Sequence, residues 1–314
     1  MIVISEFMDD SAVQLLRADF EVLHDSSLVD RPADLRTAMK LADALIVRNR
    51  TQVDSALIAG SPRLKVVGRL GVGLDNIDIG ACSARGIAVI PATGANAVSV
   101  AEYVVATAMM LLRGVYSASG DVAAGRWPRA RLSQGRELRG KTLGLIGFGS
   151  IGRVTARLAQ NLGVIVLAHD PMVAADDPAW RESKVANRSL DALLAEADVV
   201  SLHVPLIAQT RGMLNASRIA LMKRGAVLIN SARGGIVEES AVIDALRAGA
   251  LGGAALDVFE HEPLAANAAW ADVPNLILTP HVAGVTVEAN ARVSDLIAER
   301  VANALLVERA PKAR

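Results

Sequence analysis

The chain has 314 residues, and its 33 Lys and Arg side chains are balanced by 33 Asp and Glu side chains, so the formal net charge is zero. Proteins that bind nucleic acid or anionic membranes through charge carry a basic excess, which this sequence lacks. The one cysteine, Cys82, excludes an intrachain disulfide and a cysteine-based zinc site. A chain longer than about 250 residues predicts two domains, each with its own core.

Targeting signals are absent from the sequence as read. The N-terminus, Met1–Glu6, has no basic region of the kind that opens a signal peptide. No run of about 20 apolar residues is present, which a membrane-spanning helix would need. We therefore expect a cytoplasmic protein with no nucleic-acid partner, no membrane partner and no metal.

Short aliphatic runs alternate with helical patterns through the first third of the chain. The predicted strands are Ile2–Ser5, Glu21–His24, Ala44–Val47, Leu64–Gly68 and Ile87–Ile90. Helical patterns lie between them, near residues 10–18, 32–41, 53–59 and 77–85. Near-continuous aliphatic strands that alternate with helices predict a parallel sheet covered on both faces.

The alternation starts again after a long helical pattern, Ala95–Arg113, and an irregular stretch that ends at Arg139. Six further strands are predicted: Thr142–Ile146, Val164–His169, Val199–His203, Ala226–Asn230, Ala254–Val258 and Leu276–Thr279. The helices expected among them lie near residues 150–162, 189–196, 215–222 and 238–248. A last helix, Thr286–Leu306, follows without a further strand.

A dinucleotide-binding fingerprint, G-x-G-x-x-G, spans Gly147–Gly152 between a predicted strand and a predicted helix. Gly147 permits the tight turn, Gly149 admits a pyrophosphate to the backbone, and Gly152 lets the helix approach the strand. The next strand ends before Asp170, whose carboxylate can accept hydrogen bonds from both ribose hydroxyls and repels a 2′-phosphate. The pattern predicts NAD as the cofactor in preference to NADP; structural glycines in a plain βαβ unit are the alternative.

Three polar segments follow late strands: Ser231–Gly235, Asp257–Pro263 and Pro280–Gly284. Ligands bind at the carboxyl ends of strands in open α/β sheets. Arg233 offers a planar fork to a carboxylate, and His281 can exchange a proton with a substrate hydroxyl. These are the parts that a 2-hydroxy-acid oxidation needs. Each residue alone also fits a structural role: a surface ion pair for Arg233, a turn cap for Glu262, and a turn histidine for His281.

The chain resembles the D-isomer-specific 2-hydroxyacid dehydrogenase family, in its 3-phosphoglycerate dehydrogenase-like branch. The matching stretches are Val66–Asn76, Gly147–Gly152, Asn230–Glu238, Gly253–Pro263 and Pro280–Gly284. The resemblance implies two doubly wound parallel-sheet domains, with a Rossmann NAD-binding domain inserted in a flavodoxin-like substrate domain. The substrate domain is expected to comprise residues 1–94 and 286–314, and the NAD-binding domain residues 95–285. Because the chain ends soon after its last predicted helix, we expect no C-terminal regulatory domain.

The resemblance also assigns roles to individual residues. Arg233 is expected to bind substrate, His281 to handle the proton, and Glu262 to pair with His281. Asp257 is expected to face the nicotinamide carboxamide. The full set implied to line the cofactor is Gly147, Gly149, Ser150, Ile151, Gly152, Asp170, Val204, Ser231, Ala232, Arg233, Asp257, His281 and Gly284.

The substrate is expected to be a small 2-hydroxy or 2-oxo acid, bound by Arg48, Arg69, Gly71, Val72, Gly73, Arg233 and His281. Arg48 and Arg69 stand where phosphoglycerate-type relatives direct arginines at a distal phosphate, so a second anionic group is expected on the substrate. Some of Arg48, Arg50 and Arg69 can equally be surface residues. Val72 replaces the Thr that such relatives often carry, which leaves the acid open.

Sulfolactate dehydrogenase and glyoxylate or hydroxypyruvate reductase are alternatives on the same scaffold. An NAD(H)-sensing binding protein like the corepressors of this fold is the alternative from another class, and a phosphite-type oxidoreductase is a third. The Ala95–Arg113 pattern resembles the family's dimerisation helix, which implies a homodimer, but its apolar stripe also fits burial against its own sheet. Arg129 or Arg131 is placed by the resemblance on a loop that reaches the partner subunit.

Overall fold

The structure, a computed structural model, describes residues 1–309 and divides into two compact units. Unit 1 comprises Met1–Asn96 and the C-terminal segment that begins at Val285, and unit 2 comprises Ala97–Gly284. Residues 310–314, which fall in the predicted substrate domain, lie outside the described residues.

Unit 1 is built on a five-stranded, wholly parallel sheet in the order β2-β1-β3-β4-β5. This is the flavodoxin-like strand order. The strands are β1 Ile2–Ile4, β2 Val22–His24, β3 Ala44–Val47, β4 Val66–Arg69 and β5 Ala88–Pro91. The helices are α1 Asp10–Arg17, α2 Pro32–Met39, α3 Ser55–Ala59, α4 Ile79–Ala84 and α13 Val287–Arg309, with a 3-10 turn η1 at Leu28–Asp30.

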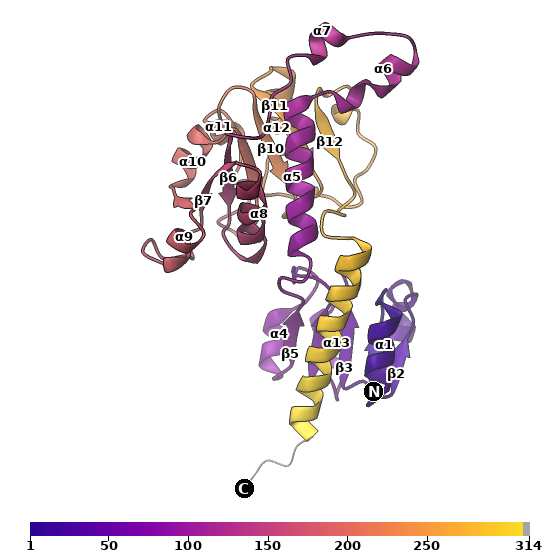
Figure 1. Ribbon diagram of the computed structural model, residues 1–314. Coiled ribbons are helices and arrows are strands. Elements are labelled where there is room, and N and C mark those ends of the chain that lie inside the picture. Colours follow the sequence, from indigo (N-terminus) through magenta and orange to yellow (C-terminus); the bar gives the residue numbers. More distant parts are fainter. Residues whose placement is uncertain (310–314) are drawn as a thin grey trace. The chain divides into compact units, whose positions relative to one another are not determined.

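Helices cover both faces of this sheet because alternate strand residues point to opposite sides and those in the middle strands are almost all apolar. Ile2 and Ile4 pack with α1 and α13 on one face, whereas Val3 packs with α2, α3 and α4 on the other. Figure 1 shows α13 crossing the sheet of unit 1 beside α1. A Cβ at Gly68 in β4 would lie 2.8 Å from a methyl carbon of Val301, so a glycine is needed there for α13 to pack this closely.

Unit 2 is built on a seven-stranded parallel sheet in the order β12-β11-β10-β9-β6-β7-β8. Counted from β6, this is the Rossmann order 3-2-1-4-5-6 with one further strand. The strands are β6 Thr142–Ile146, β7 Ile165–His169, β8 Ala186–Asn187, β9 Val199–Leu202, β10 Ala226–Asn230, β11 Leu251–Leu256 and β12 Leu276–Leu278. The fold class is therefore the one expected: two doubly wound parallel sheets, one Rossmann and one flavodoxin-like.

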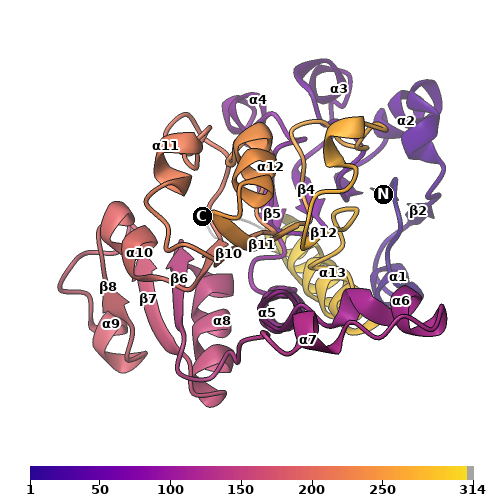
Figure 2. The same cartoon turned by 90° about the horizontal axis from the view of Figure 1, so that it is seen from above.

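The helices of unit 2 form a layer on each face of the sheet, as Figure 2 shows. Helices α5 and α8 cover one face, and α10, α11 and α12 cover the other. The longer helices are α5 Ala97–Arg113, α8 Ser150–Asn161, α10 Leu190–Glu196 and α12 Glu239–Arg247. The short ones are η2 Tyr116–Ala118, α6 Ser119–Ala123, α7 Arg129–Leu132, α9 Pro178–Glu182, α11 Ala216–Ile219 and η3 Ala268–Trp270.

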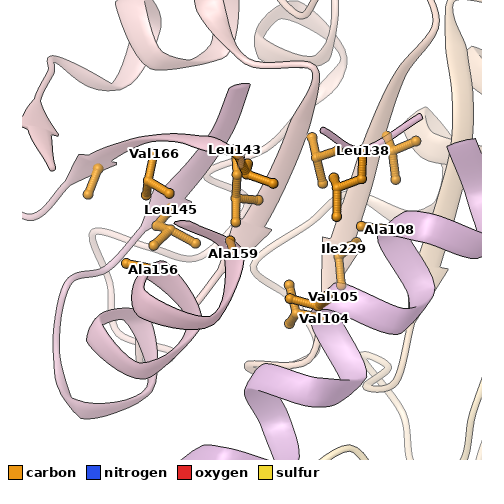
Figure 3. Close-up of a cluster of buried hydrophobic side chains, with 14 of the residues drawn as sticks. Val104, Val105, Ala108, Leu138, Leu143, Leu145, Ala156, Ala159, Val166 and Ile229 are labelled. Carbon is orange, nitrogen blue, oxygen red and sulfur yellow. The ribbon is translucent and has the colours of Figure 1, made fainter. Parts of the chain in front are cut away.

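The first core of unit 2 joins α5 to β6, β7, β10 and α8 (Figure 3). The apolar stripe expected on α5 consists of Val98, Ala101, Val105, Ala108 and Leu112. Val105, Ala108 and Leu112 lie in this core and Ala101 is buried, while Val98 is 46% exposed. The stripe is thus mainly buried within its own unit, which was the second of the two readings of this helix.

Several predicted boundaries shift, and short elements appear that the sequence pattern did not predict. Strand β11 begins at Leu251, earlier than expected, because Leu251 and Gly253 pair with Ala226 and Val227 of β10, with a register shift at Gly252 between them. The two-residue edge strand β8 and the short helices α6, α7 and α9 carry too few apolar residues to show a period.

Within residues 1–309, no single helix has both the length and the apolar character needed to cross a membrane. The segments Ala97–Arg113 and Tyr116–Ala123 meet that requirement only jointly, and they are bent by 68° relative to each other.

Candidate active site

The glycine fingerprint forms the turn between β6 and α8, and each glycine has a different constraint. Gly147 has φ +101°, and a Cβ there would lie 2.4 Å from the carbonyl oxygen of His203. A Cβ at Gly152 would lie 2.4 Å from the carbonyl oxygen of Gly147. A Cβ at Gly149 would meet nothing within 4 Å. The first and third glycines therefore allow close internal packing, and the second leaves open space at the N-terminus of α8.

Asp170 follows β7 and lies against this turn. Its Oδ2 accepts a hydrogen bond from the backbone N–H of Phe148 at 2.8 Å, and its Oδ1 accepts one from Met172 at 2.9 Å. A carboxylate has about four acceptor positions, so two remain for ribose hydroxyls. Val204, which follows the carboxyl end of β9, also lies close to Gly147: a Cβ added at Gly147 would be 3.0 Å from Cγ1 of Val204.

These features fit a dinucleotide. Strands β6 and β9 are neighbours, and the strand order reverses between them, which is where open α/β sheets bind nucleotides. Ser150 and Ile151 form the first turn of α8, whose N-terminal N–H groups suit a pyrophosphate. At the end of β10, the buried Oγ of Ser231 has no hydrogen-bond partner within the described part of the chain. A bound group with polar atoms would satisfy it.

Burial lowers the pKa of His203 to about 4, so this imidazole beside the fingerprint is neutral near pH 7. Its Nε2 lies 3.1 Å from Oγ of the buried Ser201, and its backbone N–H donates to Ile146 at 2.7 Å. A neutral ring adds no charge next to the place expected for the cofactor phosphates.

Arg233 lies on a turn that follows β10, and the buried side chain of Asn230 shapes this turn. Asn230 Oδ1 accepts from the N–H of Ala232 at 3.1 Å, and its Nδ2 donates to the carbonyl of Arg233 at 3.0 Å. A Cβ at Gly234 would lie 1.8 Å from the carbonyl oxygen of Phe259, so this turn packs directly on the segment that follows β11. Arg233 is thereby brought beside the segment that carries Glu262.

Glu262 and His281 form a hydrogen-bonded pair. Oε2 of Glu262 lies 2.8 Å from Nδ1 of His281, and Oε1 accepts from the backbone N–H of Phe259 at 3.0 Å. An ionised carboxylate only accepts, so Nδ1 carries the proton and a neutral ring keeps its lone pair on Nε2. The side chain of His281 is 39% exposed, which leaves the ring accessible. The pair has the geometry of an oriented general acid–base.

The backbone of His281 is itself held by Asp257. His281 has φ +58°, a region that costs a non-glycine residue free energy. Its N–H donates to the carbonyl of Asp257 at 2.8 Å, and the buried carboxylate of Asp257 accepts from the N–H groups of Val282 and Ala283 at 2.9 and 2.8 Å. Asp257, expected from the resemblance at the nicotinamide, therefore also fixes the turn that presents the histidine.

A hydroxyl chain completes this network. Thr279 Oγ1 donates to Asp257 Oδ1 at 2.6 Å, and the Tyr103 hydroxyl, 2.7 Å from the same Oγ1, donates to it. Burial raises the pKa of Tyr103 to about 12, the charge of Asp257 adds to the rise, and the bond to Thr279 opposes it. Asn230, Thr279 and Tyr103 were not among the site residues expected from the sequence. The signal for Asn230 was available, because a polar residue closes an otherwise aliphatic strand.

The other expected substrate residues lie in unit 1, on neighbouring strand ends. Arg48 directly follows β3, Arg69 ends β4, and Val47 is paired with Arg69 in the parallel ladder. Arg69 Nη1 donates to the carbonyl of Leu70 at 3.1 Å and lies over Gly71, where a Cβ would be 1.5 Å from it. Gly71, Val72 and Gly73 form the bend after β4. Each unit thus gathers its own group of expected site residues at the carboxyl ends of its strands.

A cavity of about 680 Å³ opens elsewhere in unit 2, beside the C-terminal end of α5. Arg113, Tyr116, Arg131 and Arg136 line it together with Asn275, and it contains none of the residues that form the candidate site. Across residues 1–309, no three His, Cys, Asp or Glu side chains cluster so that they could hold a metal ion.

Comparison with known proteins assigns the family. Residues 105–283 match the family profile described as D-isomer specific 2-hydroxyacid dehydrogenase, NAD binding domain. The chain belongs to the D-isomer-specific 2-hydroxyacid dehydrogenase family. The dehydrogenase is therefore an NAD-dependent oxidoreductase that acts on CH–OH groups, as expected from the sequence, and the alternative of a binding protein without enzymatic activity is set aside.

Three relatives describe the range of this family. The dehydrogenase is 54% identical over 304 residues to the (S)-sulfolactate dehydrogenase of Chromohalobacter salexigens, which covers 97% of this chain and 98% of that one. It is 37% identical to the D-3-phosphoglycerate dehydrogenase of Archaeoglobus fulgidus over 96% of this chain but only 56% of that protein. The crystal structure of the Aquifex aeolicus D-lactate dehydrogenase with NAD and lactic acid matches with a TM-score of 0.85, at 29% identity over 98% of this chain and 96% of that one.

Proposed function

We propose that the dehydrogenase oxidises a three-carbon D-2-hydroxy acid that carries a second anionic group, with (S)-3-sulfolactate as the first candidate. The observation that carries this proposal is the pair Arg48 and Arg69 on adjacent strand ends of unit 1. Two guanidinium groups suit a sulfonate or phosphate. The near end-to-end similarity to a sulfolactate dehydrogenase supports sulfonate over phosphate, since the phosphoglycerate relative is matched over about half its length.

The stereochemistry of the two names is consistent. In sulfolactate the sulfur-bearing carbon outranks the carboxylate in the sequence rules, whereas in lactate the carboxylate outranks the methyl group. The descriptor therefore changes from R to S although the spatial arrangement is the same. (S)-Sulfolactate is thus D-configured, like the substrates of a D-isomer-specific enzyme.

In the proposed reaction, Arg233 binds the substrate carboxylate through its planar fork. His281 Nε2 accepts the proton of the C2 hydroxyl during oxidation and returns it during reduction. Glu262, bonded to Nδ1, holds the ring and stabilises the imidazolium that forms. NAD, when bound, supplies the hydride acceptor for C2. Ser231, Ala232 and Asp257 are proposed to contact it together with the fingerprint residues, Asp170, Val204 and Gly284.

The two units have separate proposed roles. Unit 2 is the NAD-binding domain and unit 1 the substrate domain, which contributes Arg48, Arg69 and the Gly71–Gly73 bend. Arg50 is excluded from this set because its guanidinium forms an ion pair with Asp30 and its side chain is 60% exposed.

A substrate panel tests the proposal. We expect kcat/KM with NAD to be highest for (S)-sulfolactate, lower for 3-phospho-D-glycerate, and lowest for D-glycerate and D-lactate. Arg48→Ala and Arg69→Ala should each lower kcat/KM for (S)-sulfolactate by about tenfold to a hundredfold, the value of a charged hydrogen bond. Arg50→Ala is the matched control and should have no effect. A preference for glyoxylate or hydroxypyruvate over sulfopyruvate in the reverse direction would contradict the proposal.

We further propose a cytoplasmic homodimer. Tyr116, Val122 and Trp127, on the segment between α5 and β6, are 60%, 46% and 76% exposed, and such large apolar side chains favour a protein contact. Light scattering of the purified chain should give twice the mass of one chain, and Trp127→Ala should shift the equilibrium towards the monomer. A monodisperse monomer at micromolar concentration would contradict this assignment.

A further inference from the structure

The loop after β3 is held by one buried carboxylate. Glu6, which is 5% exposed, accepts hydrogen bonds from four successive backbone N–H groups. Its Oε1 accepts from Arg48 and Thr51 at 2.9 and 3.0 Å, and its Oε2 accepts from Asn49 and Arg50 at 3.3 and 3.1 Å. A carboxylate offers about four acceptor positions, so this loop occupies all of them.

The carbonyl side of the same loop is fixed as well. Asn76 Nδ2 donates to the carbonyls of Thr51 and Arg48 at 2.7 and 3.4 Å. The hydroxyls of Ser5 and Thr51 form a hydrogen bond of 2.9 Å, and both residues are buried. A loop with its N–H and C=O groups both bonded to buried side chains has one backbone conformation, so the Cα–Cβ direction of Arg48 is set before any ligand binds.

The side chain of Arg48 is then oriented by neutral groups. Its Nη2 donates to Oδ1 of Asn290 on α13 at 2.9 Å, and its guanidinium carbon lies 5.9 Å from the ring centre of Phe7. No described carboxylate lies within ion-pair distance of it; burial lowers the pKa of Arg48, and the charge of Glu6, whose oxygens are bonded to the loop backbone, opposes this shift. Arg50, two residues further, has its charge paired with Asp30. Arg50 therefore has a carboxylate ion-pair partner, whereas Arg48 on the same loop is bonded to a neutral amide.

We propose that Glu6 and Asn290 are positioning residues that hold the guanidinium of Arg48 for the distal anionic group of the substrate. This inference rests on the proposed function, in which Arg48 binds that group. A neutral amide holds the guanidinium without neutralising it, so the arginine keeps its full charge for the sulfonate. A carboxylate at position 290 would hold the same geometry and compete with the substrate.

The decisive variant is therefore Asn290→Asp, which preserves size and the acceptor oxygen and adds one negative charge. We expect it to raise the KM for (S)-sulfolactate about tenfold with kcat changed less than about threefold, and to lower the selectivity ratio of (S)-sulfolactate over D-lactate by a similar factor. Asn290→Gln, which keeps the neutral amide, is the matched control, and its KM should stay close to that of wild type.

Glu6→Gln tests the hydrogen bonds between the Glu6 carboxylate and the loop backbone. A glutamine presents one acceptor oxygen and one donor group to four N–H donors, so the loop must shift and KM for (S)-sulfolactate should rise. Its melting temperature is measured beside its kinetics, and Arg50→Ala serves as the control on the same loop.

The outcomes separate the two proposals. If Arg48→Ala raises the KM for (S)-sulfolactate but Asn290→Asp leaves it within twofold of wild type, the positioning role is wrong and the proposed function stands. If Arg48→Ala itself has no effect, the role of Arg48 at the distal anion is wrong and the positioning inference falls with it. A rise in KM for both Arg48→Ala and Asn290→Asp, with the KM of Asn290→Gln close to that of wild type, supports the inference.

Discussion

The carboxylate of Glu262 is fixed at both oxygens, by the backbone N–H of Phe259 at 3.0 Å and by Nδ1 of His281 at 2.8 Å. Because the first contact holds the carboxylate against the segment after β11, the second sets both the orientation and the tautomer of the imidazole. The turn of Arg233 packs on the same segment through Gly234, at a distance that no Cβ could tolerate. One short segment therefore positions the proposed carboxylate-binding residue and the proposed acid–base pair.

Removal of the imidazole tests this pair. His281→Ala is expected to lower kcat by about a hundredfold or more, because no other described group replaces Nε2, and to leave the Kd of NADH within about twofold. Glu262→Gln is expected to lower kcat by at least about tenfold, because the ring loses the partner that fixes its tautomer. The measurements are steady-state rates and NADH fluorescence titration. His261→Ala, which changes an exposed neighbouring histidine, should leave both unchanged; wild-type turnover by His281→Ala would refute the assignment.

The carboxylate of Asp170 is expected to set the preference for NAD. Asp170→Ser removes the acceptor for ribose hydroxyls and the charge that repels a 2′-phosphate, so kcat/KM for NAD should fall about tenfold or more while that for NADP rises. Parallel kinetics with the two cofactors measure the ratio. The control is Asp176→Ser, an exposed acid on the following loop. An unchanged ratio in the Asp170 variant would show that another residue discriminates the cofactors.

Substitutions of two fingerprint glycines should have different effects, one on the stability of the fold and the other on the affinity for NADH. Gly152→Ala places a Cβ 2.4 Å from a backbone carbonyl and should destabilise the fold by about 1–3 kcal/mol, seen as a lower Tm. Gly149→Ala meets nothing within 4 Å, so its Tm should stay near that of wild type while the Kd of NADH rises at least about tenfold. Normal NADH binding by Gly149→Ala would mean that the cofactor does not approach this backbone.

The lowered pKa of His203 should make the stability of the fold decrease in acid. Its pKa is about 4 in the fold and near 6.5 when unfolded, so between these values the unfolded chain binds more protons and stability is lost as the pH falls. The loss at pH 5 relative to pH 8 is about 2 kcal/mol by this linkage. Urea unfolding of wild type and His203→Gln at both pH values isolates the effect from carboxylates that titrate in both proteins. Equal pH dependence in the two proteins would show that His203 does not remain neutral.

Much of the fold follows from local pattern. Aliphatic strands bounded by turn residues mark β3, β6 and β10 at their observed ends, because the interior of a strand buried on both faces is almost entirely apolar. The short elements β8, α6, α7 and α9 escape such analysis because they lack a buried stripe long enough to have a period. The sequence likewise predicted the glycine fingerprint, the acid at position 170 and the strand-end positions of Arg233 and His281, since the spacing of these residues relative to strands is a local property.

Other relationships needed the tertiary structure. Three relationships depend on which strands become neighbours. The first is which carboxylate contacts His281, and the second is that Asn230 and Asp257 hold the turns of the site. The third is that Glu6 binds four backbone amides of a loop more than 40 residues away. The same holds for the arginines: Arg48 and Arg50 look equivalent in sequence, yet Asp30 pairs with one and Asn290 contacts the other. The sequence by itself determined the elements and the residue types at their ends, because these follow from burial and backbone preference. The partners of each side chain were decided only by the packing of segments distant in the chain, because a hydrogen bond depends on position to a few tenths of an ångström, and no local pattern specifies that.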